Sequence, residues 1–224
     1  MTYTVMSNVP APPGPEDTAS DAVFNAVNPL VMRQVAQVTG RGSLGEKQER
    51  WYRFVRDAIR YDPFAINLDP AENAASRTIE NQSGHCVHKS VLLVTGFRVL
   101  GVPSRLGLAR VRNHLATSSL EARLGTDVLT PHGYAAFWNG DRWVKCTPVF
   151  NRSLCEKLGT VPLEWDPRSD TLFQPLDASG RRFMEYIDDY GLYSRIPMQF
   201  IRSELEAMYP RAFDASGQWS LPEH

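Results

Sequence analysis

Cys86 stands at the start of a long apolar segment, in the stretch GHCVHKSVLLVTGFRVLG. Ser83 or Gly84 can begin a helix there and Gly101 can end it, so Cys86 is expected in the first helical turn. The unpaired N–H groups and the positive end of the helix dipole favour a thiolate at that position. This placement predicts a nucleophile with a lowered pKa, and the alternative is a small apolar packing residue.

A candidate base comes from a predicted β-hairpin. The runs HGYAAFW and RWVKCTPV are separated by residues 139–140, Asn-Gly, which is a strong signal for a two-residue turn. With that turn, Trp138 pairs with Asp141 and His132 lies directly opposite Thr147, with Cβ atoms about 4.5 to 5.5 Å apart. A longer loop would shift this register. The hairpin thus predicts a histidine base beside a hydroxyl that can fix its tautomer.

The elements that position these residues follow from the spacing of apolar side chains. Residues 28–40 and 44–61 have apolar residues three and four apart and are predicted helices, whereas 104–111 reads as a strand. The last third of the chain reads as an irregular segment and two helices, the first beginning near Asp177 or Ser179 and the second covering 196–209.

The sequence also predicts how the chain is divided into a leader, a core and a C-terminal extension. Residues 1–20 are rich in Pro, Ser and acidic residues and are predicted to form a mobile leader. Residues 21–224 are expected to form one domain, with a core at 51–151 and a C-terminal extension at 152–224. The sequence does not indicate an oligomeric state.

Composition narrows the function classes. The 224 residues carry a net charge of −1, which gives no electrostatic footprint for nucleic acid. No apolar run reaches the roughly 18 to 20 residues of a membrane helix, and the N-terminus lacks the layout of a signal peptide, so a cytoplasmic protein without nucleic-acid or membrane partners is expected. The three cysteines form no CxxC pair, which predicts reduced thiols.

A metal centre is the alternative use of the same residues. His85, Cys86, His114 and His132 could form a cluster, but adjacent His85 and Cys86 do not match common zinc spacings. We therefore expect no metal and no organic cofactor.

Taken in order, GHCVHKSVLLVTGFRVLGVPSR, a following strand and HGYAAFWNGDRWVKCTP resemble the transglutaminase-like superfamily over roughly residues 51–151. The family pattern is Gly-x-Cys at a helix start, a Gly-Ile/Val-Pro-x-Arg turn, a His-led strand and a Trp-led strand. The resemblance implies a papain-like α+β fold, in which the Cys-bearing helix packs on an antiparallel sheet with helices at both ends of the chain. It also implies that Cys86 is the nucleophile and His132 its base.

The third catalytic position departs from the family pattern. Four residues after the strand Trp the family usually has Asp, whereas Trp143 is followed at that distance by Thr147. A hydroxyl can fix the imidazole tautomer but cannot stabilise imidazolium with a negative charge. Asn151 is a rival orienting residue, since amides serve this role in papain-like enzymes.

These residues together predict an enzyme that acts on a protein, peptide or other amide through a thioester. Cys86 would attack the carbonyl, His132 would take the thiol proton, and backbone N–H groups at the helix start would stabilise the oxyanion. The thioester would pass to water or to an amine. The alternative is a binding or scaffold module that keeps the fold without turnover because the Asp is missing.

Overall fold

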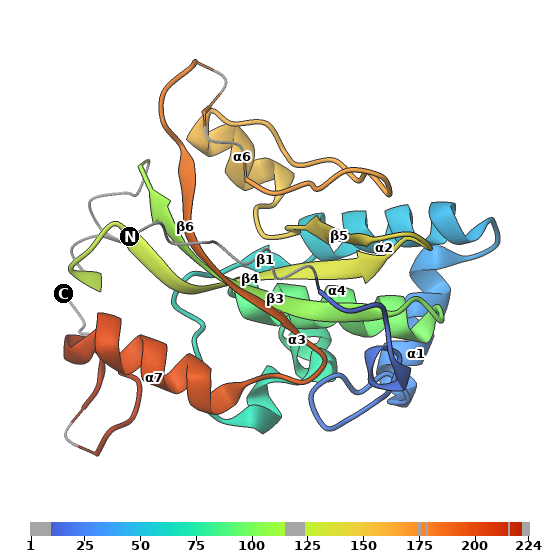
Figure 1. Cartoon of the computed structure of the whole chain (residues 1–224), viewed down its shortest axis with the longest axis horizontal. Helices are drawn as coiled ribbons and strands as arrows, with labels where there is room; N and C mark the ends of the chain where they lie inside the picture. Colours follow the sequence, from blue (N-terminus) through green and yellow to red (C-terminus); the bar gives the residue numbers. More distant parts are fainter. Residues whose placement is uncertain (1–9, 115–123, 174–175, 178, 215, 221–224) are drawn as a thin grey trace, which may run out of the picture.

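One antiparallel sheet organises the molecule (Figure 1). The computed structural model describes residues 10–114, 124–173, 176–177, 179–214 and 216–220. Its sheet has the order β5-β4-β3-β6. The strands are β3 (Ser104–Asn113), β4 (Val128–Trp138), β5 (Trp143–Cys146) and β6 (Met184–Tyr193), and a short parallel pair joins β1 (Arg60–Tyr61) to β2 (Ser83–Gly84).

Helices precede the sheet along the chain, and further helices come directly before and directly after its last strand, β6. They are α1 (Pro29–Thr39), α2 (Leu44–Asp57), α3 (Ala75–Asn81), α4 (Cys86–Val99), α6 (Arg152–Leu158) and α7 (Met198–Met208), with 3₁₀ turns at Pro15–Asp17, Pro70–Asn73 and Pro210–Ala212. In Figure 1, α6 lies above the sheet and α7 below it. No helix in the described ranges is both long and apolar enough to cross a membrane.

The N-terminal helices begin where the sequence predicts. The Asn28 side chain accepts a hydrogen bond from the backbone N–H of Leu30, with Pro29 at the first helical position of α1. Ser43 and Glu46 form a capping box at the start of α2. Each cap satisfies backbone N–H groups that the helix itself leaves unpaired.

Helix α4 is the centre of the core, and its residues from Cys86 to Arg98 are all buried. Its contact with α2 is close: a Cβ on Gly96 would lie 1.9 Å from Nε1 of Trp51, and that Nε1 donates a hydrogen bond to the Leu93 carbonyl. Gly96 is therefore required by packing. The other side of α4 packs on β4, where the rings of Phe97 and Phe137 meet edge to face at 5.4 Å.

The predicted hairpin exists, but the predicted register is wrong. Trp138 pairs with Trp143 and not with Asp141, because the loop has four residues. Asn139 makes this longer loop, since its side chain accepts hydrogen bonds from the N–H groups of Asp141 and Arg142. The shift is two residues, and an even shift keeps every side chain on its predicted face.

The C-terminal extension differs from expectation in one element. The segment expected to form a helix from Asp177 or Ser179 onward is instead strand β6, which pairs with β3, while the expected final helix is confirmed as α7. Without β6, β3 would leave an edge of unpaired N–H and C=O groups. Tertiary pairing of this kind outweighs the weak helical spacing of the segment.

The predicted mobile leader is wrong for residues 10–20, whereas residues 1–9 lie outside the described part of the chain. Asp17 is fully buried and accepts two hydrogen bonds from the Arg105 guanidinium at 2.7 Å. The Ala11 carbonyl accepts a hydrogen bond from the indole N–H of Trp143. The charge-assisted bidentate pair between Asp17 and Arg105 holds this N-terminal segment on the sheet. The composition of the segment did not predict this contact.

Candidate active site

Cys86 lies in the first turn of α4, as predicted, and is the first residue of this helix, with its thiol against strand β4. The thiol donates a hydrogen bond to the Pro131 carbonyl, with sulfur and oxygen 3.9 Å apart. The carbonyl of Pro131 and the N–H of Gly133 point toward the side of β4 on which β5 lies. The pairing of β5 with β4 ends at Ala135, so β5 does not reach these two groups. The sulfur therefore occupies a strand edge that β5 has left open.

Gly133 allows this close approach. A Cβ at this position would lie 2.7 Å from the Val87 Cα and 3.0 Å from the Cys86 carbonyl carbon. Both contacts are to backbone atoms, which cannot move aside as a flexible side chain could. A glycine is therefore needed directly after His132 for α4 to start against the strand.

The charge state of Cys86 differs from the sequence prediction. Burial raises the pKa of the thiol to about 11, although the backbone N–H groups of Gly133, Val87 and Cys86 itself act to lower it. The side chain is only 8% exposed, so desolvation of a thiolate outweighs the helix terminus. The predicted lowered pKa is wrong for this closed state, and the thiol is protonated at neutral pH.

His132 lies on β4 between the two residues that contact Cys86. It is 2% exposed, and burial lowers the pKa of its imidazole to about 3, so the ring is neutral. The centroid of its ring lies 5.2 Å from that of Phe173 and 6.0 Å from that of Tyr186. Its buried Nε2 has no hydrogen-bond partner among the described residues. Within the described structure no hydrogen bond joins His132 to the Cys86 thiol, which is held by Pro131 instead.

Thr147 follows the last residue of β5 and is almost fully buried. Continuing the β4–β5 register places it opposite Tyr134, one step along the same face from His132. Its buried hydroxyl also has no hydrogen-bond partner among the described residues. The structure therefore places Thr147 diagonally from His132 and not directly across from it.

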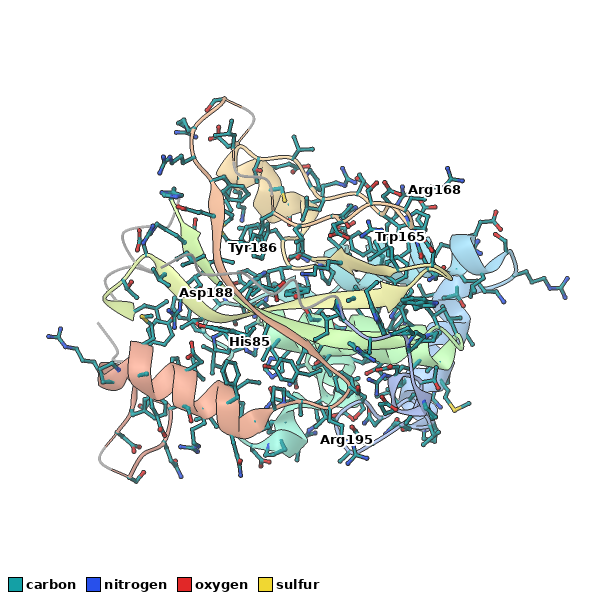
Figure 2. The ribbon with its side chains drawn as sticks, viewed as in Figure 1. His85, Trp165, Arg168, Tyr186, Asp188 and Arg195 are labelled. Carbon is teal, nitrogen blue, oxygen red and sulfur yellow. The ribbon has the colours of Figure 1, made fainter. Side chains whose placement is uncertain are left out.

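Tyr186 of β6 is a site residue that the sequence prediction missed (Figure 2). Burial raises the pKa of its phenol, while the Thr147 hydroxyl and the Phe173 backbone act in the opposite direction. The Tyr186 hydroxyl is likewise buried without a hydrogen-bond partner among the described residues. Three buried polar groups, from His132, Thr147 and Tyr186, thus gather at one place, and reading 184–193 as a strand would have been the signal for the third.

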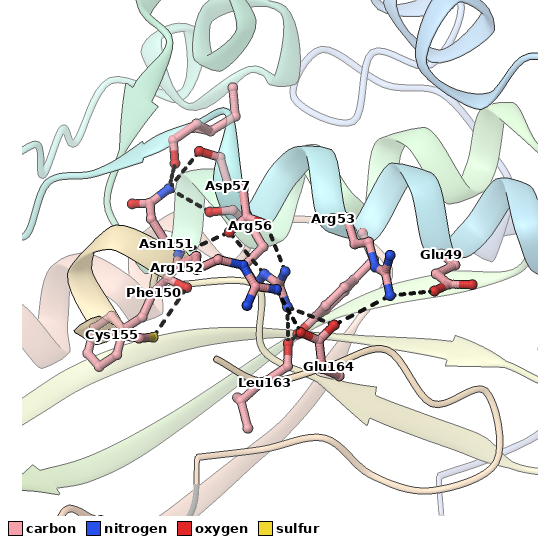
Figure 3. A network of polar contacts seen from close by, with 12 residues as sticks. Glu49, Arg53, Arg56, Asp57, Phe150, Asn151, Arg152, Cys155, Leu163 and Glu164 are labelled. Atoms are coloured by element: carbon pink, nitrogen blue, oxygen red, sulfur yellow. Dashed lines mark hydrogen bonds and ion pairs between the residues drawn. The ribbon is translucent and has the colours of Figure 1, made fainter. Parts of the chain in front are cut away.

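The Asn151 side chain is used in hydrogen bonds to backbone groups near the end of α2 (Figure 3). Its side-chain N–H₂ donates to the carbonyls of Arg56 and Ile59 at 2.6 and 2.7 Å, and its oxygen accepts from the Tyr61 N–H at 2.8 Å. The side-chain ammonium of Lys89 donates to the same two carbonyls. Asn151 therefore ties the end of α2 to β1 and has no free group for His132.

The residues considered for a metal cluster are not gathered into one. No group of three or more His, Cys, Asp or Glu side chains within the described ranges has an arrangement that could hold a metal ion. His114 instead pairs with Glu185, with its Nε2 3.0 Å from the carboxylate. All three cysteines are free.

An apolar pocket opens beside the thiol, and α7 forms one wall of it. We call it the Cys86 pocket; its lining includes Cys86, His85, Tyr61, Ile66, Leu129, Pro131, Ile201, Leu205 and Tyr209. Glu204 holds α7 in place by accepting hydrogen bonds from Tyr190, Thr130 and Arg110. The C-terminal extension therefore forms one wall of the pocket beside the Cys86 thiol.

The buried histidines predict a protein that loses stability in mild acid. Burial lowers the pKa of His132 to about 3 and that of His88 to about 4, from an ordinary value of 6.5. The stability they contribute is complete above pH 6.5 and is lost as the pH falls toward the folded-state pKa values. At pH 5 each should cost about 2 kcal/mol of unfolding free energy.

Urea unfolding at pH 7, 6 and 5 measures this loss. His88→Gln should flatten the pH dependence, whereas Thr95→Val, a buried change elsewhere on α4, should leave its slope unchanged. Equal unfolding free energies of the natural protein at pH 7 and 5 would contradict neutral burial of these imidazoles.

Comparison with known proteins identifies the family of this chain. A sequence profile described as the Transglutaminase-like superfamily matches residues 32–148, from α1 to just beyond Thr147. A search of curated proteins finds no match. A solved chain from Cytophaga hutchinsonii, provisionally described as a cysteine protease, is similar at 13% identity and a TM-score of 0.45, over 79% of this chain and 53% of that one, so this chain spans about half of its length. The profile covers more than half of the sequence, and the chain belongs to the transglutaminase-like superfamily.

Proposed function

We propose that the protein catalyses cysteine-dependent acyl transfer or hydrolysis at an amide bond, with Cys86 as nucleophile and His132 as base. The carrying observation is the position of the thiol at the first residue of α4, where the N–H groups of Gly133, Val87 and Cys86 face the sulfur. Such convergent donors stabilise negative charge at or next to the sulfur during acyl transfer. Membership of the family supports a cysteine-dependent activity in general.

Acylation begins from a neutral pair in this proposal. The thiol leaves the Pro131 carbonyl and turns around the open edge of β4 toward the imidazole, which is neutral and able to accept its proton. Sulfur then bonds to the substrate carbonyl carbon, and the imidazolium gives its proton to the leaving amine. A rotation of this kind is consistent with the looser geometry of unliganded sites.

The imidazole tautomer needs an acceptor for its remaining N–H. Nε2 of His132 is the buried ring nitrogen without a partner, and the hydroxyls of Thr147 and Tyr186 are buried without strict partners. A cavity of about 10 Å³, which is near the lower size limit for one water, is lined by Thr147, Phe150 and Phe173. In this proposal the buried hydroxyls of Thr147 and Tyr186 take the place of the carboxylate as acceptors for the imidazole N–H.

The substrate class follows from the Cys86 pocket. Its walls are mainly aliphatic and aromatic, with Ile66, Leu129 and Ile201 among them. Such a lining favours an apolar group on the acyl side of the scissile bond. We therefore propose a peptide or amide substrate with an apolar acyl portion.

The activity can be tested with chromogenic acyl donors, namely p-nitrophenyl esters and p-nitroanilides of acylated apolar amino acids. A burst approaching one equivalent of chromophore, followed by slower turnover, is expected from a thioester intermediate. Cys86→Ala protein is the matched blank. A rate no greater than that of this blank, for every donor, would reject the enzyme and favour the binding-module alternative.

Thr147→Val should lower turnover by about 10-fold, or about 1.4 kcal/mol, because it removes a buried hydroxyl at nearly constant volume. Thr147→Asp should hold or raise the rate, since a carboxylate would stabilise imidazolium. Steady-state kinetics of both variants, with urea unfolding as a check on the fold, measure the effect.

Asn151→Ala is the contrasting variant. It should reduce the unfolding free energy by about 3 kcal/mol, because it leaves several buried groups unpaired, while the folded fraction keeps its turnover rate. If Asn151→Ala lowered turnover of the folded protein more than Thr147→Val does, the assignment of Thr147 would be wrong.

The binding-module alternative rests on the site's neutrality. The described residues place no carboxylate in hydrogen bond with His132, and burial keeps the thiol protonated. A protein of this kind would bind peptides in the Cys86 pocket without forming a thioester. Binding of an apolar peptide with equal affinity by natural protein and Cys86→Ala, with no burst, is its expected signature.

A further inference from the structure

The Cys86 pocket is small for a substrate site. Its volume is about 40 Å³. A single water needs roughly 10 to 15 Å³ of such space, whereas an apolar cavity of about 150 Å³ binds benzene. Beside the thiol there is therefore room for about one or two carbon atoms, and not for a branched or aromatic side chain.

The depth of the pocket is limited by one face of α7. Ile201, Leu205 and Tyr209 line the pocket and follow one another at intervals of four residues, which places them on the same side of the helix and its C-terminal cap. Ile201 is 5% exposed and Leu205 is 2% exposed. These two aliphatic side chains are closely packed, so they leave no spare volume on this side of the pocket.

Hydrogen bonds on both sides of Leu205 hold this wall against the sheet. Glu204 accepts hydrogen bonds from the hydroxyls of Tyr190 on β6 and Thr130 on β4. The hydroxyl of Tyr209 donates to the Val128 carbonyl at 2.8 Å and accepts from the Thr130 N–H at 2.9 Å. Moving α7 outward to admit a larger group would break these bonds, so the small volume is a property of the anchored helix.

The rest of a substrate has more space. Ile66 lines the Cys86 pocket and also a larger, more open cleft of about 510 Å³, whose lining includes Leu68, Arg202 and Trp219. A chain attached to the acyl residue can therefore pass Ile66 and continue in this outer cleft. The restriction falls on the acyl residue itself and not on the length of the substrate.

We propose that the acyl donor is a peptide or amide whose acyl residue is glycine or alanine, and that Ile201 and Leu205 set this limit. The proposal rests on the thioester chemistry proposed above. A hydrogen atom or a methyl group fits beside the thiol. The side chain of leucine or phenylalanine would meet Ile201 and Leu205 before the carbonyl carbon reached the sulfur, so the limit acts on acylation.

The size limit can be measured with the p-nitrophenyl esters of acetylglycine, acetylalanine, acetylleucine and acetylphenylalanine. The second-order rate constant of the burst, corrected with Cys86→Ala protein, should be similar for the glycyl and alanyl donors. It should be lower by about 10-fold or more for the leucyl and phenylalanyl donors, because a single methylene in an apolar pocket already changes such constants by roughly 10- to 200-fold.

Two variants test the assignment to α7. Leu205→Ala should raise the rate constant of the leucyl donor by about 10-fold or more, while that of the glycyl donor changes by less than about threefold. Ile201→Val, a smaller change on the same face, should shift the ratio of leucyl to glycyl rates in the same direction by less. Loss of folded protein would lower all donors together, so this ratio separates specificity from stability, and urea unfolding checks each variant.

Met208→Ala is the matched control, since Met208 lies on α7 but is not among the described residues that line the Cys86 pocket. It should leave the ratio unchanged. A leucyl or phenylalanyl donor that acylated the natural protein as fast as the alanyl donor would overturn the size limit while the thioester mechanism stands. An unchanged ratio in both Leu205→Ala and Ile201→Val would overturn the role of α7. No burst with any donor would reject the proposed function, and the size limit with it.

Discussion

Replacing Cys86 by alanine is expected to lower kcat/KM for acyl donors by at least about 10³-fold, because the thioester can no longer form. The change should be tolerated by the fold. Cys86 makes one weak hydrogen bond, to Pro131, and alanine fits the same space in the first turn of α4. Initial rates and the burst amplitude, with urea unfolding alongside, measure both effects.

The other cysteines are the matched controls for this loss. Cys146 and Cys155 are also buried, and burial raises the pKa of each thiol. Cys146 lies on β5, and Cys155 is the fourth residue of α6, where its thiol donates to the Phe150 carbonyl. Cys146→Ala and Cys155→Ala should each keep the burst. A loss of burst in either that matched Cys86→Ala would mean that the nucleophile had been misassigned.

Replacing His132 by alanine should slow the acylation burst by about 10² to 10⁴-fold, the range typical of a lost general base. Because the thiol has a pKa of about 11, little thiolate forms at neutral pH without a proton acceptor. Added imidazole should restore part of the burst, since the variant leaves a space where the ring was. The rate of thioester formation at pH 7, with and without imidazole, measures this.

The same experiment distinguishes His132 from its neighbour. His85, and not His132, is among the residues that line the Cys86 pocket, so His85 is a competing base on position alone. With His132 as the base, His85→Gln should leave the burst rate intact, whereas His132→Ala slows the burst. The reverse pattern would exchange the two roles.

The helix that carries Cys86 and the candidate pair could be predicted from local signals. Gly101, with its positive φ, ends α4 as predicted, whereas the start at Ser83 or Gly84 was predicted wrongly, because those residues form β2 and His85 precedes the helix. The face shared by His132 and Thr147 was also predictable. The predicted register was wrong by two residues, but both side chains stayed on the predicted face, because strand side chains alternate with a period of two.

What could not be predicted depends on contacts between distant segments. Tyr186 reaches the site only because β6 pairs with β3, about seventy residues earlier in sequence. The pKa of Cys86 depends on how far α7 and β4 bury it, and the sign of that shift was predicted wrongly from the helix terminus alone. The packing of Asp17 on Arg105 likewise depends on a partner far along the chain.

The site chemistry also depends on the C-terminal extension. Helix α7 narrows the Cys86 pocket, and Glu204 fixes it to Tyr190 and Thr130 on the sheet. Helix α7, with Glu204, and Tyr190 lie beyond the 32–148 match, so the family pattern carries no information on them. The extension is therefore where this chain's substrate preference is expected to be set.

The most direct test of the central claim is to locate the acyl group. Natural protein is mixed with a p-nitrophenyl ester, quenched in acid during the burst, digested, and analysed by peptide mass spectrometry. We expect one added acyl group, on Cys86, that is released by hydroxylamine and is absent from His132→Ala quenched at the same time. An acyl group on Cys146, Cys155 or a lysine, or an equal yield on Cys86 in His132→Ala, would contradict it.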